Sequence, residues 1–362
     1  MRRGTGRFPR QLEVFDLYER FRDTPALQES FVEMGLMEGT GAPEGRADFP
    51  FYLQTMIRLR MRERFRTVAA KWQQYTGREN AQDFREHRVT QINGIFGMAP
   101  VNEFGEYDRM RSAEEPGPPF SVGKHGGIYG ITYEMVVNDE QDRMLNRIPR
   151  EIGRTAAEYV SRVVVAFVES NPNYIDSQPF MSTARGNERT TAAAQPTETN
   201  LASVVNEMTL KRDPNGIPFT VRPRTIITKS LETALIFRKI KRSQETGVTK
   251  EAPTPREFGP GTLNPLADEE AVPGTIIQEP WFNDADDWLV LGDVDDRPAF
   301  LVAFLRNQTE PFIGIKDEGV RSAMGGGRDP YTFDFDEIPF KVRHVFGAAL
   351  GEPMAVYRAR PS

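Results

Sequence analysis

The sequence predicts an α+β fold with more than one domain, part of which extends away from the compact cores. The chain has 362 residues, enough for two or more domains of ~100–200 residues each. An amphipathic pattern over 145–170 predicts a long helix, and alternation of apolar and polar residues over 128–137 predicts a strand. Between 87 and 127, many Gly and Pro residues separate short β-like pieces, which predicts an extended segment.

Composition narrows the class of protein. Lys and Arg number 46 and Asp and Glu 52, and the formal net charge of −6 argues against a chain that binds nucleic acid over its whole surface. Because there is no cysteine, the chain has no disulfide, zinc ribbon or thiolate nucleophile. Only His87, His125 and His344 could serve a metal site or acid–base catalysis near neutral pH. No stretch reaches the ~18 apolar residues of a membrane span, so we expect a soluble, unsecreted chain without cofactors.

The first fifty residues are predicted to be an extension with a short amphipathic helix or two. Leu12, Phe15, Leu17 and Phe21 could form one apolar face of such a helix. The basic start is either a solvated terminus or an arm that lies on a neighbouring subunit or contacts phosphate. From 49 to 76 the pattern becomes helical, and its alternating arginines are expected to be solvated or to lie at an interface.

Segment 87–127 is predicted to be a projecting hairpin, with the acidic, proline-rich AEEPGPP as a turn in its second half. Arms of about fifteen residues would reach roughly 50 Å at ~3.3 Å per residue. A hairpin of that length is not stable alone in water, so it needs a partner surface.

The helix predicted at 145–170 is expected to begin regularly near Pro149, because proline suits a first turn. Asn171-Pro172 is expected to end it. One stripe of apolar residues recurs at helical spacing and would face the core. Its members are Leu145, Ile148, Ile152, Ala156, Tyr159, Val160, Val163, Val164 and Phe167.

Beyond this helix the chain mixes short elements with loops. An exposed loop is expected at 183–200, and a strand at 225–228 that leads into a helix capped by Ser230 or Thr228. Another long Gly/Pro-rich loop spans 251–274. Three apolar runs, WLVLGD, AFLVAFL and PFIGIKD, predict a meander, and two further strands are expected around Gly347–Gly351.

No pattern specific to an enzyme is present. Two acidic groups could bind a divalent cation, but solvated turns fit them better because the EF-hand spacing is not met. Their members are Asp284, Asp286, Asp287, Asp293, Asp295 and Asp296. The run MGGGRDP lacks the Lys-Ser/Thr of a phosphate loop. Ser182 or Ser203 could pair with a histidine, but no nucleophile elbow occurs.

Five stretches resemble the major capsid proteins of tailed bacteriophages, which share the Hong Kong 97-type fold, and in particular the Mu-like major head subunit group. The strand, Asn-Asp and helix block is the most specific of them. The stretches are DFPFYLQTMIRLRMRERF, ENAQDFREHRV, VNEFGEYDRM, GGIYGITYEMVVNDEQDRMLNRIPREIGRTAAEYV and FKVRHVFGAALGEPMAVYR.

The resemblance implies a division of the chain. Residues 1–86 would be an N-terminal arm with helices, and 87–127 the extended loop that overlaps an adjacent subunit. Residues 128–172 would carry a strand and the long spine helix of the peripheral domain, 173–285 the axial domain, and 286–362 the strands that return to both domains.

The resemblance also implies a non-enzymatic shell protein of the virion, assembled in the host bacterial cytoplasm. Pentamers and hexamers would form an icosahedral or prolate shell around double-stranded DNA, with a portal and possible scaffold, protease or decoration proteins as partners. Heterologous contacts between identical chains suit such a shell, and the charge of −6 would keep the inner wall from binding DNA too tightly. The alternatives are an encapsulin-like nanocompartment or, from another class, a soluble hydrolase.

Candidate assembly residues follow from the basic start, the hairpin and the polar surface of the long helix. They are Arg2, Arg3, Phe104, Tyr107, Arg109, Arg111, Glu114, Glu115, Phe120, Lys124, Arg147, Arg150 and Arg154.

Overall fold

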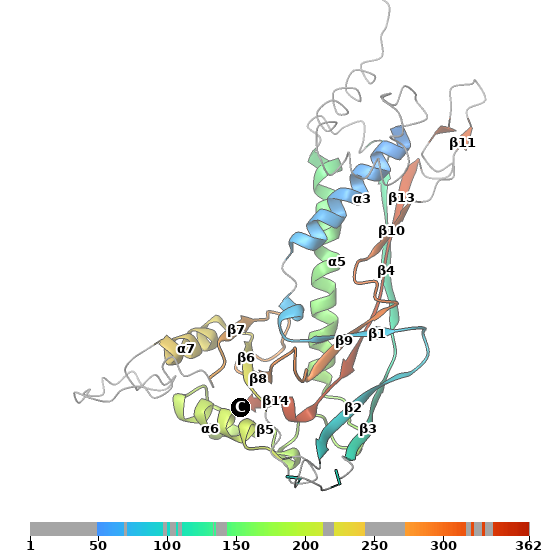
Figure 1. Cartoon of the computed structure of the whole chain (residues 1–362). Coiled ribbons are helices and arrows are strands. Elements are labelled where there is room, and N and C mark those ends of the chain that lie inside the picture. Colours follow the sequence, from blue (N-terminus) through green and yellow to red (C-terminus); the bar gives the residue numbers. More distant parts are fainter. Residues whose placement is uncertain are drawn as a thin grey trace, which may run out of the picture. The chain divides into compact units, whose positions relative to one another are not determined.

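The computed structural model describes most of the chain from residue 49 onward, in two compact units that are treated separately below (Figure 1). The predicted helices of the first fifty residues and most of the loop at 251–274 lie outside the described residues. The described ranges are 49–68, 71–96, 100–101, 106–107, 111–132, 134, 143–212, 221–242, 272–315, 320–321, 328–329 and 336–361.

The first unit takes its described residues from the segments Met1–Ala69, Gly126–Ala157 and Glu310–His344. It contains helix α3 (Phe49–Thr67) and parts of three longer elements, and strand β10 (Phe312–Ile315). Those three elements are strand β4 (Gly123–Thr132), helix α5 (Arg143–Ser170) and strand β13 (Glu337–Leu350). A small antiparallel pair, β11 (Val320–Arg321) and β12 (Arg328–Asp329), completes its secondary structure among the described residues.

A small hydrophobic core holds the first unit together. Strand β13 pairs with β4 on one side and, antiparallel, with β10 on the other. The core residues come from α3, β4 and β13, and Ile152 of α5 packs against them. The fully buried members are Ile57, Met61, Ile131, Ile338 and Phe340.

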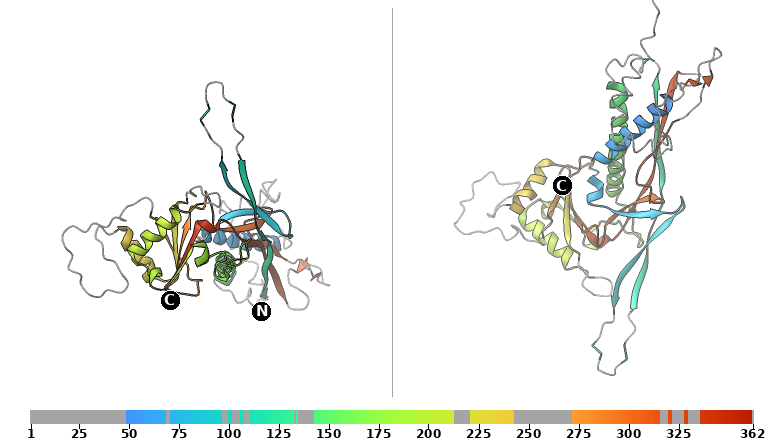
Figure 2. Two further views of the ribbon diagram at one scale, coloured as in Figure 1. Left: turned by 90° about the horizontal axis from the view of Figure 1, so that it is seen from below. Right: turned by 45° about the horizontal axis from the view of Figure 1, so that its top comes forward.

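The second unit takes its described residues from Ala70–His125, Glu158–Thr309 and Val345–Ser362. Its main sheet has the order β5-β14-β8-β6-β7. Helices α6 (Glu198–Thr209) and α7 (Leu231–Arg242) lie against one side of this sheet (Figure 2). The strands are β5 (Glu188–Thr190), β6 (Pro223–Thr228), β7 (Thr275–Gln278), β8 (Trp288–Gly292) and β14 (Val356–Arg360).

Burial explains why the inner strand β8 is apolar throughout. Every residue of β8 is buried, and the indole N–H of Trp288 donates a hydrogen bond to the Ala194 carbonyl at 2.7 Å. The later half of α5 adds Val160, Val164 and Val168 to the same core. Burying one such side chain contributes roughly 1.5–3 kcal/mol.

A second group of strands lies beside this core within the same unit. Strand β1 (Gly77–Ala81) pairs in parallel with β9 (Phe300–Leu305), and β9 pairs antiparallel with the end of β13. Strands β2 (His87–Phe96) and β3 (Arg111–Phe120) form a separate two-stranded antiparallel ribbon that projects from the unit (Figure 2). Short 3-10 helices connect these elements: η1 (Lys71–Gln74), η2 (Thr183–Arg185), η3 (Thr191–Ala194) and η4 (Pro353–Ala355).

Several expectations from the sequence are confirmed. The mixed α+β class is correct, α5 ends at Ser170 directly before Asn171-Pro172, and the hairpin pairs His87 with Phe120 at its base. The hydroxyl of Ser230 accepts a hydrogen bond from the Glu232 backbone N–H at 3.2 Å, as expected of a cap before α7.

Helix α5 differs from prediction in two ways. Pro149 lies inside the helix, as its seventh residue, rather than in the first turn. The buried face of α5 is also rotated about the helix axis relative to the predicted apolar stripe, because the small residues Gly153 and Ala157 allow close packing on that face. It runs through Pro149, Gly153, Ala157, Val160, Val164 and Val168, with Ser161 and Val165 buried beside it, whereas Tyr159 is 40% exposed.

Four other predictions about local structure are wrong. The strand expected at 128–137 ends at Thr132, Glu134 is helical, and the rest of that segment lies outside the described residues. The expected exposed loop at 183–200 folds into η2, β5, η3 and the start of α6. Finally, AEEPGPP is part of β3 rather than a turn. Proline has no backbone N–H to donate, and a two-stranded ribbon tolerates it where no further strand would need that donor.

The predicted meander is the fourth error. Strand β8 belongs to the main sheet, whereas β9 and β10 each pair with β13 and not with each other. The long strand β13 supplies hydrogen-bonding groups over its whole length, so both shorter strands pair with it.

Among the described helices, none is long and apolar enough to cross a membrane.

Candidate assembly surfaces

The base of the β2–β3 hairpin is anchored in the core of the second unit. Phe120 at the end of β3 and Val122 two residues later are buried with Ala81 of β1, Leu301 of β9 and Ala349 of β13. Gly347 allows this approach, since a Cβ there would lie 2.2 Å from the Ser121 carbonyl oxygen. The hairpin therefore starts from a packed platform.

Two of the three histidines of the chain flank this base. The His87 ring lies 5.7 Å from that of Phe120, and its Nε2 is 3.2 Å from an Asp83 carboxylate oxygen. On the exit strand, the His125 ring lies 4.4 Å from that of Phe346, and Nδ1 is 3.3 Å from the Tyr159 hydroxyl. These contacts fix where both strands leave the platform.

Beyond the base, β2 and β3 pair with each other and with no other described strand. Tyr107, in the segment between the two strands, is 87% exposed. Beside the base, Phe84 is 47% exposed, and the Lys124 ammonium lies 5.0 Å from the centre of its ring. An isolated ribbon of this kind is at best marginally stable in water. It thus presents contact surface that its own chain leaves uncovered.

In the first unit, α3 and the start of α5 present a basic surface. Arg62 and Arg66 donate to the two carboxylate oxygens of Glu310 at 2.7 and 2.6 Å. Partial burial would raise the pKa of Glu310, but the hydrogen bonds from Arg66 and Arg62 outweigh it and lower that pKa. Arg147 and Arg150 are exposed on α5.

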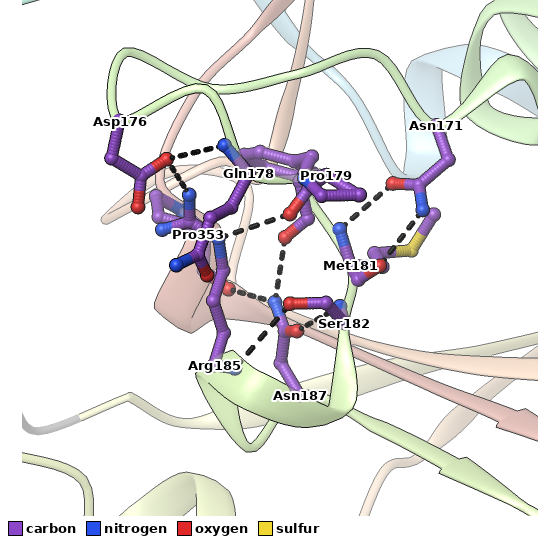
Figure 3. Close-up of polar contacts among 10 residues, drawn as sticks. Asn171, Asp176, Gln178, Pro179, Met181, Ser182, Arg185, Asn187 and Pro353 are labelled. Carbon is purple, nitrogen blue, oxygen red and sulfur yellow. Dashed lines mark hydrogen bonds and ion pairs between the residues drawn. The ribbon is translucent and has the colours of Figure 1, made fainter.

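The loop that follows α5 is held by two asparagine side chains (Figure 3). The Asn171 side chain accepts from the Met181 N–H and donates to the Met181 carbonyl, both at 2.8 Å. The buried Asn187 side chain accepts from the Ser182 N–H and donates to the carbonyls of Phe180 and Pro353 at 2.9 and 3.0 Å. These bonds join the loop to the segment before β14.

The two acidic groups do not behave alike. Asp284 and Asp293 accept backbone N–H bonds from the residues two positions on, as in polar turns. Asp287 is buried, and its carboxylate accepts from Arg358 at 3.1 Å, with Arg360 at 3.4 Å. Burial raises the pKa of Asp287, and the hydrogen bond from Arg358 offsets part of that rise. The solvated-turn interpretation is therefore wrong for Asp287, which anchors β14.

A further polar cluster joins α6 to the edge of the main sheet. Glu207 accepts from Arg189 and, at 2.8 Å, from the Tyr357 hydroxyl. Burial lowers the pKa of nearby Lys211 to about 8, although the carboxylates of Glu207 and Glu352 favour its charged form. These contacts hold α6 against β5 and β14.

The sequence-predicted residues fall into three groups. Tyr107, Lys124, Arg147, Arg150 and Arg154 are exposed in the structure, and Arg154 is paired with Glu151 at 3.5 Å. Arg111, Glu114 and Glu115 lie on β3 at positions paired with Phe96, Ile92 and Gln91. Phe120 is buried in the chain's own core, so we remove it from the candidate contacts. Arg2, Arg3, Phe104 and Arg109 lie outside the described residues.

Two features of the surfaces were not singled out from the sequence. Phe84 follows no apolar pattern, and only its spacing from His87 places it near the hairpin. The Tyr159–His125–Phe346 contact joins three distant segments, so no local pattern predicts it.

The described residues contain no group of three or more acidic or histidine side chains placed to hold a metal ion. The Ser182 hydroxyl accepts from the Arg185 N–H, and the Ser203 hydroxyl accepts from Arg189, so both proposed nucleophiles have structural roles. The histidines contact Asp83, Tyr159 and Phe65 rather than either serine.

Comparison with known proteins identifies the class. A family model described as phage capsid protein matches residues 117–359, about two thirds of the chain. The chain belongs to this phage capsid protein family. No curated protein sequence matches it.

Solved structures with which the chain can be superimposed include three particles. One is Mycobacterium phage Adephagia, with 11% identity and a TM-score of 0.45, over 79% of this chain and 88% of that chain. Another is the procapsid of bacteriophage JBD30, with 12% identity and a TM-score of 0.44, over 86% of this chain and 75% of that chain. A third is a virus-like particle from Pyrococcus furiosus, with 12% identity and a TM-score of 0.44, over 84% of this chain and 98% of that chain.

Family membership confirms the expected class of protein. The chain is a structural capsid protein, not an enzyme, and self-assembly into a shell of the virion is its role. Membership in the Mu-like group stays a prediction, as do the domain boundaries.

Proposed function

We propose that this chain is the major subunit of a tailed-phage head with the Hong Kong 97-type architecture. Copies would assemble as pentamers and hexamers into an icosahedral or prolate shell that encloses double-stranded DNA. The observation that carries this proposal is the β2–β3 hairpin, anchored at Phe120 and His125 but otherwise paired only with itself among the described residues.

The hairpin is proposed to lie on an adjacent subunit. In a shell built from one chain, each surface must meet a different surface next door, so a projecting ribbon on one copy needs a receiving surface on the next. Tyr107, Phe84 and Lys124 supply exposed apolar and charged groups for that contact. A stable interface buries on the order of 1,200–2,000 Å², which a ribbon of this length and its base can help to supply.

The predicted division into arm, extended loop, peripheral domain and axial domain belongs to the same proposal. So do a portal, any scaffold, protease or decoration protein, and assembly in the host bacterial cytoplasm.

Imaging of the purified chain tests the proposal. We expect negative-stain micrographs to show closed shells, and shells recovered from phage-producing cells to contain DNA. Shells filled with a cargo protein would favour the encapsulin-like alternative. A ~41 kDa species that never assembles would contradict the shell altogether.

A further inference from the structure

An arginine-rich surface covers two helices of the first unit. Helix α3 has five arginines and one glutamate, and residues 147–157 of α5 have three arginines and one glutamate. Neither stretch contains a lysine or an aspartate. In a chain whose formal net charge is −6, this surface is a local reversal of sign.

The two helices touch, so these charges share one surface. A Cβ on Gly153 would lie 2.4 Å from the Met61 carbonyl oxygen and 3.3 Å from the Cβ of Arg64. Arg64 therefore leaves α3 at the point where it meets α5. Along α5, Arg147, Arg150 and Arg154 follow at spacings of three and four residues, which puts them on one face of a helix.

Part of this charge is neutralised within the unit. Arg62 and Arg66 bind Glu310, Arg60 pairs with Glu63, and Arg154 pairs with Glu151. Of the arginines on this surface, four are exposed and form no ion pair with a described residue: Arg58, Arg64, Arg147 and Arg150. Their guanidinium groups are available to an external anion.

The chemistry of the surface favours a polyphosphate backbone over a protein. Among residues 57–67 of α3 and 147–157 of α5, no large hydrophobic side chain is exposed. Protein interfaces are built around buried apolar and aromatic anchors, which these two stretches do not offer. Arginine presents a planar fork of donors that binds phosphate in a bidentate manner. Duplex DNA offers one negative charge per ~1.7 Å of its axis, enough for several arginines along one turn or two of helix.

We propose that the arginine surface of α3 and α5 binds the phosphate backbone of double-stranded DNA without reading its sequence. This inference rests on the proposed function, because it assigns to that shell the residues that contact its DNA. It also changes the expectation for Arg147, Arg150 and Arg154, which the sequence assigned to subunit contacts. The overall negative charge limits the contact to this surface.

Salt dependence tests the proposal on the unassembled full-length chain. The probe is a mixed-sequence DNA duplex of about 30 base pairs, and binding is measured by fluorescence anisotropy from low to moderate salt. Each phosphate contact contributes about −0.9 to the slope of log K against log salt concentration. We expect Arg147→Gln/Arg150→Gln/Arg154→Gln to reduce the magnitude of that slope by about 2, because Arg147 and Arg150 are unpaired within the described residues whereas Arg154 already pairs with Glu151.

Two variants separate this effect from general loss of charge or of fold. Arg238→Gln/Lys239→Gln/Arg242→Gln removes three charges from an exposed face of α7 and should leave the slope within about one of the unmodified chain. Replacing Arg147, Arg150 and Arg154 by lysine retains the charge and should retain most of the slope. Equal slopes for the two glutamine variants would overturn the proposal.

Shell formation distinguishes this proposal from the proposed function. If the glutamine variant of α5 keeps the DNA slope but no longer forms shells, the three arginines are subunit contacts and the DNA proposal is wrong. If polyglutamate binds the unmodified chain as tightly as the duplex does, the surface fits an acidic protein instead. If the unmodified chain forms no shells at all, the proposed function fails whatever the slopes are.

Discussion

Gly153 of α5 and Met61 of α3 meet through their backbones. A Cβ atom on Gly153 would lie 2.4 Å from the Met61 carbonyl oxygen, a distance that real Cβ contacts do not reach. The absence of a side chain at Gly153 is what lets the two helices approach, and it brings Arg64 close to α5. The small core of the first unit and its arginine surface therefore depend on one glycine.

Replacing Gly153 by alanine should destabilise the first unit. Alanine favours a helix over glycine by about 1 kcal/mol, but the clash is with backbone, which cannot rotate away. Overpacking of this kind costs about 1–3 kcal/mol, so we expect a net loss in the free energy of unfolding measured in urea. Gly127→Ala is the matched control, because a Cβ there meets no atom within 4 Å. Equal stability of the two variants would show that the helices separate easily.

The Glu310 pair predicts a dependence of stability on acid pH. Because the folded state lowers the pKa of Glu310, its contribution is present above the ordinary glutamate pKa of about 4.3 and is lost as pH falls through the folded value. Glu310→Gln should lower the free energy of unfolding at pH 7 by no more than about 1 kcal/mol, since the pair is partly exposed. The difference from the unmodified chain should shrink toward zero below pH 4. A difference that stayed constant with pH would assign it to packing rather than charge.

Lys211 predicts a second rise of stability with pH, in mild alkali. Its pKa is about 8 in the folded chain and about 10.4 when unfolded, so between these values only the unfolded chain holds the proton. Stability should then rise from pH 8 to pH 10. Lys211→Met should remove this part of the rise, whereas Lys239→Met, on an exposed face of α7, should keep it. Thermal denaturation followed across this pH range makes the comparison.

Asn187 should be sensitive to loss of its side chain. Alanine would leave the Ser182 N–H and the carbonyls of Phe180 and Pro353 without their partner, at about 1–3 kcal/mol for each buried group left unsatisfied. We expect Asn187→Ala to lower the free energy of unfolding by several kcal/mol, and Asn173→Ala, an exposed control, by less than about 0.5 kcal/mol. Similar values for both would mean that water replaces the lost bonds.

Local patterns predicted the elements that local physics determines. The period of α5 and its stop at Asn171-Pro172, the cap at Ser230 and the apolar runs of β8 and β9 all depend on residues within a few positions of one another. The resemblance to phage capsid proteins rested on such stretches, and the family match confirms it.

Tertiary contacts explain what the sequence did not predict. Pro149 lies inside α5 and is buried. One turn further on, Gly153 is also buried, where α5 contacts α3. The local sequence around Asp287 is typical of a turn, but its carboxylate binds Arg358, 71 positions later in the chain. Phe120 looked available to a neighbour, yet β1, β9 and β13 bury it. Each outcome depends on a partner far away in the sequence.

Shortening the hairpin tests the central claim that this ribbon is completed by another copy of the chain. Gln91 and Glu115 are paired across β2 and β3, so replacing residues 92–114 by Asn-Gly joins them through a two-residue turn and leaves Phe120 and the base intact. Sedimentation velocity of both chains under the same assembly conditions is the decisive measurement. We predict that the full-length chain sediments as closed shells. The shortened chain should stay a small species, and its circular dichroism spectrum should show that its helices and remaining strands are still folded. Shells of normal size from the shortened chain would contradict the account.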